Sequence, residues 1–334
     1  CMIKAALKNK ISELAFRAPS VHNVQPWVLD VGTEIITVYD DLTRTLSVGD
    51  ASLHDHEVSL GALIEGISLI LSSEGLGISN IEALKSHSVP FQGRNLRERY
   101  KLTVATGFAE DKLFSLIARR KSYRGVFLNS SEQDRQALLQ GFSGDLSGVV
   151  SDVKELKQWA KIYDRCSVES NRNRALQTEL YQWMRFGSEQ NYNRDGLNRE
   201  ALSISSIEGL AAKMLLKPCT YALLNKLGLA GVVMTEAPQI SSATGLVVIF
   251  KAPGLSALEN GRNFYRLWLQ LTEAGFYACP LSALVDHPEG RKQIEQRFDN
   301  KSVLNVLRVG RTLPEKLYNS PRLPVFETLM GVNS

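Results

Sequence analysis

The chain has 334 residues, of which 44% are hydrophobic, 22% charged and 8% aromatic. This composition is typical of a globular protein and excludes intrinsic disorder, collagen-like repeats and a long coiled coil. The formal charge is only +4, and no apolar run approaches the roughly 18 residues that cross a bilayer, so we expect neither nucleic acid nor a membrane as a partner.

Apolar periodicity predicts the first elements of the chain. Residues 4–17 form a helix that ends near Pro19, because a proline disfavours helical geometry in the residue before it. Two β-like runs, 27–31 and 34–39, are joined as a hairpin. Residues 58–73 are apolar around much of a helix, so this helix is buried.

The rest of the chain alternates between the two patterns. In chain order we predict a strand at 101–106, a helix at 111–120, a mostly helical segment at 154–228, a strand at 245–250, a helix at 256–274 and a strand at 303–309. Strands and helices follow one another in no regular βαβ series. This order fits an α+β or mixed α/β fold better than a clean βαβ series, and α+β is the fold class we predict.

One internal repeat appears at an offset of 200 residues. Residues 61–84 align with 261–284, and six positions are identical, among them Gly61 with Gly261. Each segment has the pattern of a buried helix that a glycine ends and a strand-like piece follows. The repeat suggests two similar halves, although two unrelated helices would also reach this identity.

Cysteine usage favours a cytoplasmic protein. The four cysteines lack the spacing of a metal site or a disulfide framework, and isolated thiols are typical of a reducing compartment. No secretory signal peptide is visible in the sequence as given. The run His54-Asp55-His56-Glu57 resembles a metal motif, but its place before a helix indicates a solvated first turn. We expect no metal site.

Two segments carry candidate chemistry. Residues 17–27 (RAPSVHNVQPW) form a loop between a helix and a strand, pinned by two prolines and Trp27. Such a loop can present Ser, Asn and Gln groups and backbone amides to a planar, hydrogen-bonding ring. The alternative is a helix-ending turn with Trp27 in the core. The second segment is a local basic cluster at residues 119–124 (RRKSYR).

These segments resemble motifs of the FMN-dependent nitroreductase superfamily. Residues 18–27 resemble its Pro-Ser-x-x-Asn signature loop, and residues 120–124 resemble its Arg-x-Ser-x-Arg/Lys phosphate-binding segment. The tail, 308–311 and 320–324 (SPRLP), resembles the C-terminal strand and the Arg-x-Pro that closes over the flavin phosphate. Together the motifs span most of the chain.

The order of the motifs differs from that of an ordinary nitroreductase, in which the basic segment precedes the loop. Here it follows the loop by about 100 residues, which is similar to the Acg-type branch, whose single chain resembles a fused dimer that has lost one of its two flavin sites. The resemblance implies a nitroreductase-like FMN-binding fold of two fused halves. The first half would be 1–110 and the second 111–334, with a helical insertion at about 154–228 as a possible cover.

The resemblance also implies a set of flavin contacts. Arg120, Ser122, Arg124 and Arg322 would hold the FMN phosphate, since guanidinium groups bind phosphate oxygens through charge-assisted hydrogen bonds. The other expected contacts come from the loop, from the stretch after the second repeat helix and from the tail: Pro19, Ser20, Asn23, Gln25, Cys279, Pro280, Leu281 and Arg311. No catalytic side chain is expected, because flavin N5 carries the chemistry.

The function implied is that of an FMN-dependent oxidoreductase, passing hydride from NAD(P)H through flavin N5 to an electron-poor small molecule. Two alternatives stay open: a flavin-sequestering protein whose site residues 165–199 cover, and a specialised biosynthetic dehydrogenase. Only one complete site can be assembled, because residues 235–241 lack the Asn-x-Gln-Pro-Trp end of the loop. We expect one FMN per chain, bound at the seam between the halves, with a monomer sufficient.

Overall fold

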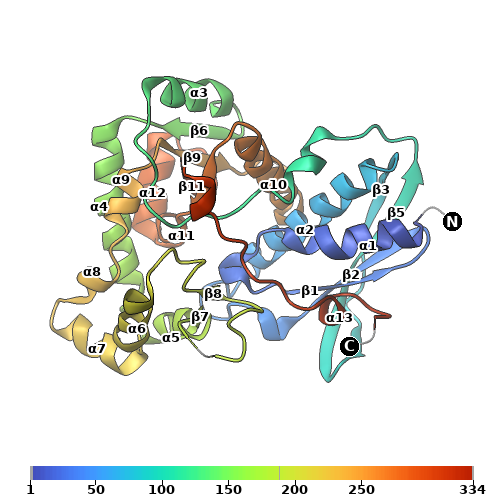
Figure 1. Ribbon diagram of the computed structural model, residues 1–334, viewed down its shortest axis with the longest axis horizontal. Coiled ribbons are helices and arrows are strands. Elements are labelled where there is room, and N and C mark those ends of the chain that lie inside the picture. Colours follow the sequence, from blue (N-terminus) through green and yellow to red (C-terminus); the bar gives the residue numbers. More distant parts are fainter. Residues whose placement is uncertain (1–2, 188, 333–334) are drawn as a thin grey trace.

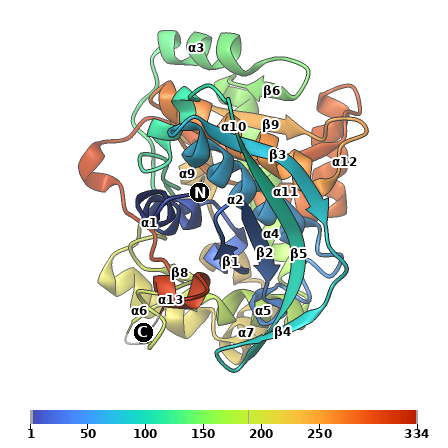
Figure 2. The same ribbon diagram turned by 90° about the vertical axis from the view of Figure 1, so that its right-hand side faces the viewer.

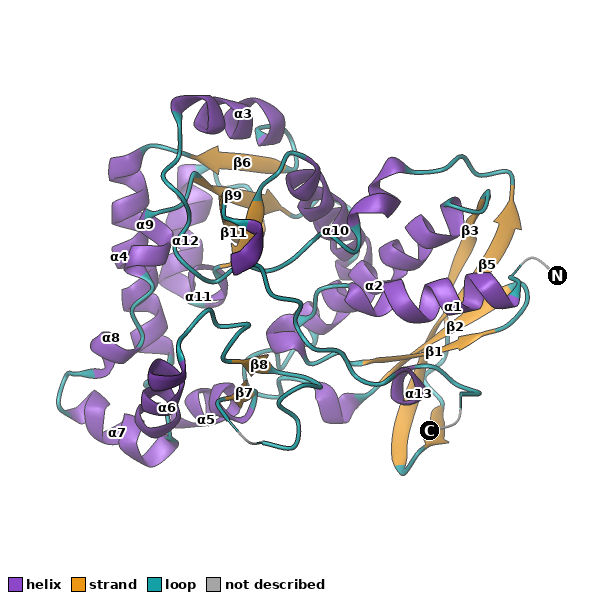
Figure 3. Ribbon diagram, viewed as in Figure 1, coloured by secondary structure: helices purple, strands orange, loops and turns teal. Residues whose placement is uncertain are grey.

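The computed structural model describes residues 3–187 and 189–332 and contains two antiparallel sheets (Figures 1 and 3). The first has the order β1-β2-β5-β3, with β4 paired to β5. Its strands are β1 Trp27–Val31, β2 Ile35–Asp40, β3 Leu76–Ala83, β4 Ser88–Phe91 and β5 Arg94–Thr106. The second has the order β10-β11-β9-β6. Its strands are β6 Ser147–Val150, β9 Gly245–Phe250, β10 Tyr277–Pro280 and β11 Val303–Gly310.

Two long helices form the centre of the molecule, α2 His54–Ser72 and α10 Ala257–Glu273, and the shorter α1 Ala5–Leu14 packs on α2. Figure 2 shows β3 and β5 of the first sheet in front, with α2 behind them and α1 to one side. α2 packs along α10, so the two helices of the sequence repeat lie side by side. The apolar core of the first sheet continues into α10 through Leu258, Tyr265 and Leu269.

The remaining elements surround the second sheet or form the insertion, apart from α13, which packs against β1. They are α3 Glu132–Phe142, α4 Val153–Ser170, α5 Arg174–Gln182, β7 Met184–Arg185, β8 Leu197–Asn198, α6 Ser206–Leu215, α7 Pro218–Lys226, α8 Ala230–Val233, α9 Ala237–Ser241, α11 Ser282–Asp286, α12 Pro288–Arg297 and α13 Val325–Thr328. After β11 the chain runs back across the molecule to the first sheet, where Leu329 pairs with Leu29 (Figure 1).

The α+β prediction is confirmed, because every strand pair in the two larger sheets is antiparallel. The predicted hairpin is present as β1 and β2, with Leu29 opposite Val38. The first helix ends at Leu14 and continues as a 3₁₀ turn, Ala15–Arg17. The strand expected at 101–106 begins earlier, at Arg94, because its charged side chains find partners across the sheet.

Two local predictions are wrong. Residues 111–120 contain only a 3₁₀ helix, Lys112–Leu116, because the chain must then extend beside β10. His56 is not in a solvated turn. It is 5% exposed and its Nε2 lies 2.8 Å from Asp40 Oδ2, where Arg97 and Arg99 also bind. Over the described residues, no group of three His, Cys, Asp or Glu side chains could hold a metal ion, and no helix combines the length and apolarity needed to cross a membrane.

Candidate functional site

The loop of residues 18–27 has an unusual backbone. His22, Asn23 and Gln25 have positive φ angles of 48°, 57° and 52°. Non-glycine residues enter this region rarely and at a cost, so surrounding contacts must impose it. Ser20 Oγ accepts from the Gln25 amide at 3.0 Å, and Gln25 Oε1 accepts from the Leu323 amide at 2.8 Å. The C-terminal tail therefore holds the loop in this shape.

Two arginines far apart in the sequence converge at the end of the first helix. The Nη2 of Arg120 donates to the carbonyl of Arg17 at 2.9 Å, and the Nη2 of Arg322 donates to the same oxygen at 3.2 Å. Arg322 Nε also donates to the Phe16 carbonyl at 2.6 Å. From the other side, Trp268 of α10 stacks on Arg120, with its ring centre 4.6 Å from the guanidinium carbon. Two of the residues expected to hold phosphate are thus adjacent.

This arginine cluster, defined as Arg17, Arg120 and Arg322, is electrostatically unbalanced. Burial, followed by repulsion from Arg120 and Arg17, lowers the pKa of Arg322 to about 9, and burial lowers the pKa of Arg120. Arg17 Nε and the Nε and Nη1 of Arg120 are buried without a hydrogen-bond partner. Buried positive charge with unused donors is strongly unfavourable unless an anion compensates it. The cluster therefore has the chemistry of an anion site.

The rest of the basic segment lies along the edge of the second sheet. Ser122 forms a parallel bridge with Ala278, and the Tyr123 amide donates to the Ala278 carbonyl at 3.1 Å. Arg124 Nη1 donates to the Ala201 carbonyl at 3.3 Å. Burial, and then the nearby charge of Arg124, lowers the pKa of His22 to about 4. His22 and Arg124 are therefore close, and the imidazole is neutral at pH 7.

Part of the insertion covers the loop; we define residues 183–187 and 189–201 as the cover. Asn23 Nδ2 donates to the carbonyls of Gly196 at 3.2 Å and Pro321 at 3.0 Å, while Asn23 Oδ1 accepts from Arg322. Gln25 Nε2 donates to the Arg194 carbonyl at 2.9 Å, and Gln25 is fully buried. Both side-chain amides, which were expected to contact a flavin, form hydrogen bonds within the protein, to backbone groups and, through Asn23 Oδ1, to Arg322.

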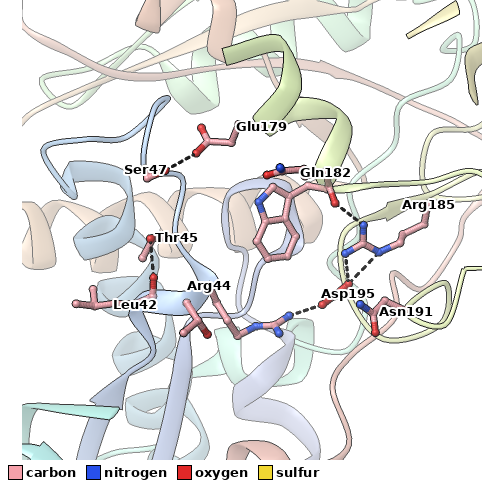
Figure 4. Close-up of a pocket in the computed structure, with 11 residues that line it drawn as sticks. Leu42, Arg44, Thr45, Ser47, Glu179, Gln182, Arg185, Asn191 and Asp195 are labelled. Carbon is pink, nitrogen blue, oxygen red and sulfur yellow. Dashed lines mark hydrogen bonds and ion pairs between the residues drawn. The ribbon is translucent and has the colours of Figure 1, made fainter. Parts of the chain in front are cut away.

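Ion pairs and hydrogen bonds connect the cover and α5 to the segment between β2 and α2, beside a cavity of about 380 Å³ (Figure 4). We call these contacts the latch. Asp195 accepts from Arg44 of that segment at 2.5 Å and from Arg185 of the cover at 2.6 Å. Arg44 also donates to the Val24 carbonyl of the loop at 2.6 Å. Glu179 of α5 accepts from the Gly49 amide at 2.7 Å. Charged contacts therefore hold the cover closed over the loop.

The remaining predicted residues are divided between the site and the core. Pro19 and Ser20 are partly exposed in the loop, and Ser20 supports the Gln25 backbone. Cys279 and Pro280 lie on β10 beside the basic segment, and Cys279 is 3% exposed. Leu281 is buried in the core of the second sheet.

Arg311 lies apart from the arginine cluster. Its Nε donates to Asp134 at 2.6 Å, and its Nη1 binds the carbonyls that end α10. The guanidinium also stacks on Phe276, with its carbon 4.4 Å from the ring centre. These contacts fix Arg311 at the joint between α3 and α10, so we leave it out of the candidate site.

Sequence analysis missed several members of the site. Arg17 is the first residue of the segment 17–27, but it was not expected to contact the flavin. The rings of Tyr265 and Trp268 both lie against the Arg120 guanidinium. Their i, i+3 spacing on one face of α10 is also the pattern of ordinary core residues, so it did not single them out. The cover contacts the loop through backbone carbonyls, which leave no sequence signal.

Comparisons with known proteins add a distant likeness. No family model matches the chain, and no curated protein matches it. Among solved structures, an iodotyrosine deiodinase bound to FMN and 3-iodo-L-tyrosine is 16% identical, covering 64% of this chain and 94% of its own, with a TM-score of 0.32. An FMN-bound nitroreductase from Bacteroides fragilis is 12% identical, with coverages of 67% and 98% and a TM-score of 0.34. The FMN-dependent nitroreductase NfnB from Mycobacterium smegmatis, in complex with NADPH, is 17% identical, with coverages of 65% and 96% and a TM-score of 0.35. TM-scores this low establish neither family nor ligand.

Proposed function

We propose that this protein is an FMN-dependent oxidoreductase whose arginine cluster binds the flavin phosphate. The observation that carries the proposal is the buried, unpaired positive charge of Arg120 with two unused donors, beside Arg322 and Arg17. A phosphate group brings two negative charges and several acceptor oxygens, which is what such a cluster lacks. The residues present therefore fit the phosphate end of FMN.

The proposal assigns a task to each part of the site. Trp268 and the Arg17 carbonyl hold the Arg120 guanidinium in place, and the Phe16 carbonyl and Asn23 hold Arg322. Ser122 and Arg124 would complete the phosphate contacts, and β10, with Cys279 and Pro280, would approach the ring. When bound, FMN supplies a hydride acceptor and donor at N5, and the protein supplies orientation and access.

The site would lie at the seam between the two proposed halves, 1–110 and 111–334. The loop belongs to the first half, whereas Arg120 and Arg322 belong to the second. The electron donor we propose is NAD(P)H, and the acceptor an electron-poor organic molecule.

A second candidate function has a specific observation in its favour. The contacts of Asn23 with Gly196 and of Gln25 with Arg194 hold the cover on the loop, and Asp195 locks it to Arg44. A cover that stays closed would give a protein that binds or sequesters flavin with little turnover.

One experiment separates these functions. The purified protein is incubated with FMN, desalted, and its absorption spectrum recorded, and NADH or NADPH oxidation is then followed with a quinone or nitroarene. Retained flavin with turnover is expected of the oxidoreductase. Retained flavin without turnover supports sequestration, and a protein that never retains flavin contradicts both functions.

A further inference from the structure

Three short helices of the insertion, α6, α7 and α8, lie at the end of the molecule opposite the two termini (Figure 1). They carry the six most exposed large apolar side chains of residues 3–187 and 189–332, with Ile207 at 82% and Val232 at 76%. We define the α6–α8 apolar surface by these residues: Ile207, Leu210, Met214, Leu223, Leu227 and Val232. α6 contacts α7 and α7 contacts α8, and exposed apolar side chains gathered on adjacent helices of a folded protein are typical of an interaction surface.

The exposed side chains follow helical faces whose opposite sides are already packed. Ile207, Leu210 and Met214 are spaced i, i+3, i+7 along one face of α6, while Gly209 on the other side contacts the Arg199 side chain. On α7, Tyr221 is 2% exposed. The exposed apolar side chains therefore do not lie on the faces by which these helices pack against the rest of the protein. They lie on the outer faces of helices that already have their internal partners.

Charge indicates the kind of partner. From Ser205 to Thr235 the charged residues are Glu208, Lys213, Lys217 and Lys226, and all four are exposed. Lys213 Nζ lies 3.5 Å from Glu189 Oε1. Lysines still outnumber the carboxylate on these helices, so two copies of this positively charged face would repel each other. Apolar side chains bordered by lysines suit an anionic lipid surface, because the apolar groups enter the headgroup boundary while the ammonium groups reach the phosphates.

We propose that the α6–α8 apolar surface binds an anionic membrane surface, with the helices lying in the plane of the interface. α6 has 10 residues and α7 has 9, which at about 1.5 Å per residue is far too short to cross a bilayer. The finding that no described helix crosses a membrane is therefore unaffected. This proposal differs from the expectation of no membrane partner, and the experiment below decides between them.

The test uses the full chain and flotation with two kinds of vesicle, pure phosphatidylcholine and phosphatidylcholine mixed with phosphatidylglycerol. We expect binding to the mixed vesicles that weakens at high salt. The variant I207S/L210S/M214S should bind roughly a hundredfold more weakly. The variant K213Q/K217Q/K226Q should lose a similar factor at low salt, at roughly fivefold per lysine. The control L146S/V153S/L255S replaces exposed apolar residues elsewhere and should bind like the parent protein.

Circular dichroism of each variant verifies folding, and light scattering gives the mass in solution. Absence of binding to the mixed vesicles overturns the proposal. Equal binding to both kinds of vesicle also overturns it, because the lysines would then have no role. A stable dimer that I207S/L210S/M214S dissociates would show that the occupant of this surface is a second copy of the chain.

Discussion

Gly61 and Gly261 meet where α2 crosses α10, and each contacts the other helix in the same way. A Cβ added to Gly61 would lie 2.0 Å from the Leu258 carbonyl oxygen, and one added to Gly261 would lie 2.2 Å from the Val58 carbonyl oxygen. Positions 58 and 258 are also 200 residues apart. The reciprocal contact is what an approximate twofold relation between two halves produces, so the weak sequence repeat reflects real packing.

Replacing either glycine should separate the two helices. We expect Gly61→Ala and Gly261→Ala each to lower the free energy of unfolding by about 3 kcal/mol, because the new methyl group meets rigid backbone. Gly141→Ala is the control, since a Cβ in that α3 position meets nothing within 4 Å and alanine favours a helix by about 1 kcal/mol. Urea unfolding of each variant and of the parent protein measures the free energies of unfolding to be compared. A Gly61→Ala variant as stable as Gly141→Ala would contradict the close crossing.

The arginine cluster should dominate flavin affinity. Arg120→Met and Arg322→Met should each weaken FMN binding by about 2 kcal/mol, roughly thirtyfold, through loss of charge-assisted bonds to phosphate. Arg311→Met is the control, because that guanidinium is held by Asp134 and should leave the dissociation constant unchanged. Fluorescence titration of each variant with FMN measures the dissociation constants. A cluster variant that is less stable than the parent protein yet keeps its flavin affinity would make the arginine structural.

His22 should give the protein a distinct pH dependence. Its pKa is lowered to about 4 from 6.5, so between these values the unfolded chain binds more protons than the folded protein. The contribution of His22 is therefore complete above pH 6.5 and is lost as the pH falls towards 4, to a total of about 3 kcal/mol. His22→Asn tolerates the positive φ and should remove this slope. Unfolding free energies of both proteins at pH 4.5 and 7 test it; parallel curves would refute the assignment.

Weakening the latch should open the cover. Asp195→Asn leaves Arg44 and Arg185 without their carboxylate, and we expect faster FMN uptake in stopped-flow mixing and faster proteolysis within residues 183–201. Arg297→Gln, which breaks an exposed pair with Glu155 on another face, should change neither rate. If Asp195→Asn leaves both rates unaltered, the cover does not control access.

The incomplete second loop at residues 235–241 leads us to expect one FMN per chain. Flavin released by denaturation, measured against protein mass, should give a ratio close to one, and light scattering should show that the monomer binds it. Two flavins per chain, or binding by a dimer alone, would disprove the single-site arrangement.

The elements predicted from the sequence were those with strong local periodicity. The buried helices α2 and α10 and the hairpin β1–β2 were predictable because each carries its apolar pattern within a few turns or one strand pair. His56 was misjudged because its partner Asp40, which also binds Arg99, comes from β2, a strand distant in sequence from the start of α2. No local pattern could place Asn23 against Arg322, 299 residues away.

The return of the C-terminal tail has a consequence for how the protein is made. Arg322 and Leu323 bind the loop near the start of the chain, and Leu329 pairs with Leu29. During synthesis the first sheet and the loop emerge from the ribosome long before these residues do. The loop, with its three positive φ angles, therefore cannot adopt its final shape until residues 322–329 have been synthesised. A nascent chain stalled shortly before Arg322 would have both sheets available to fold but no anion site.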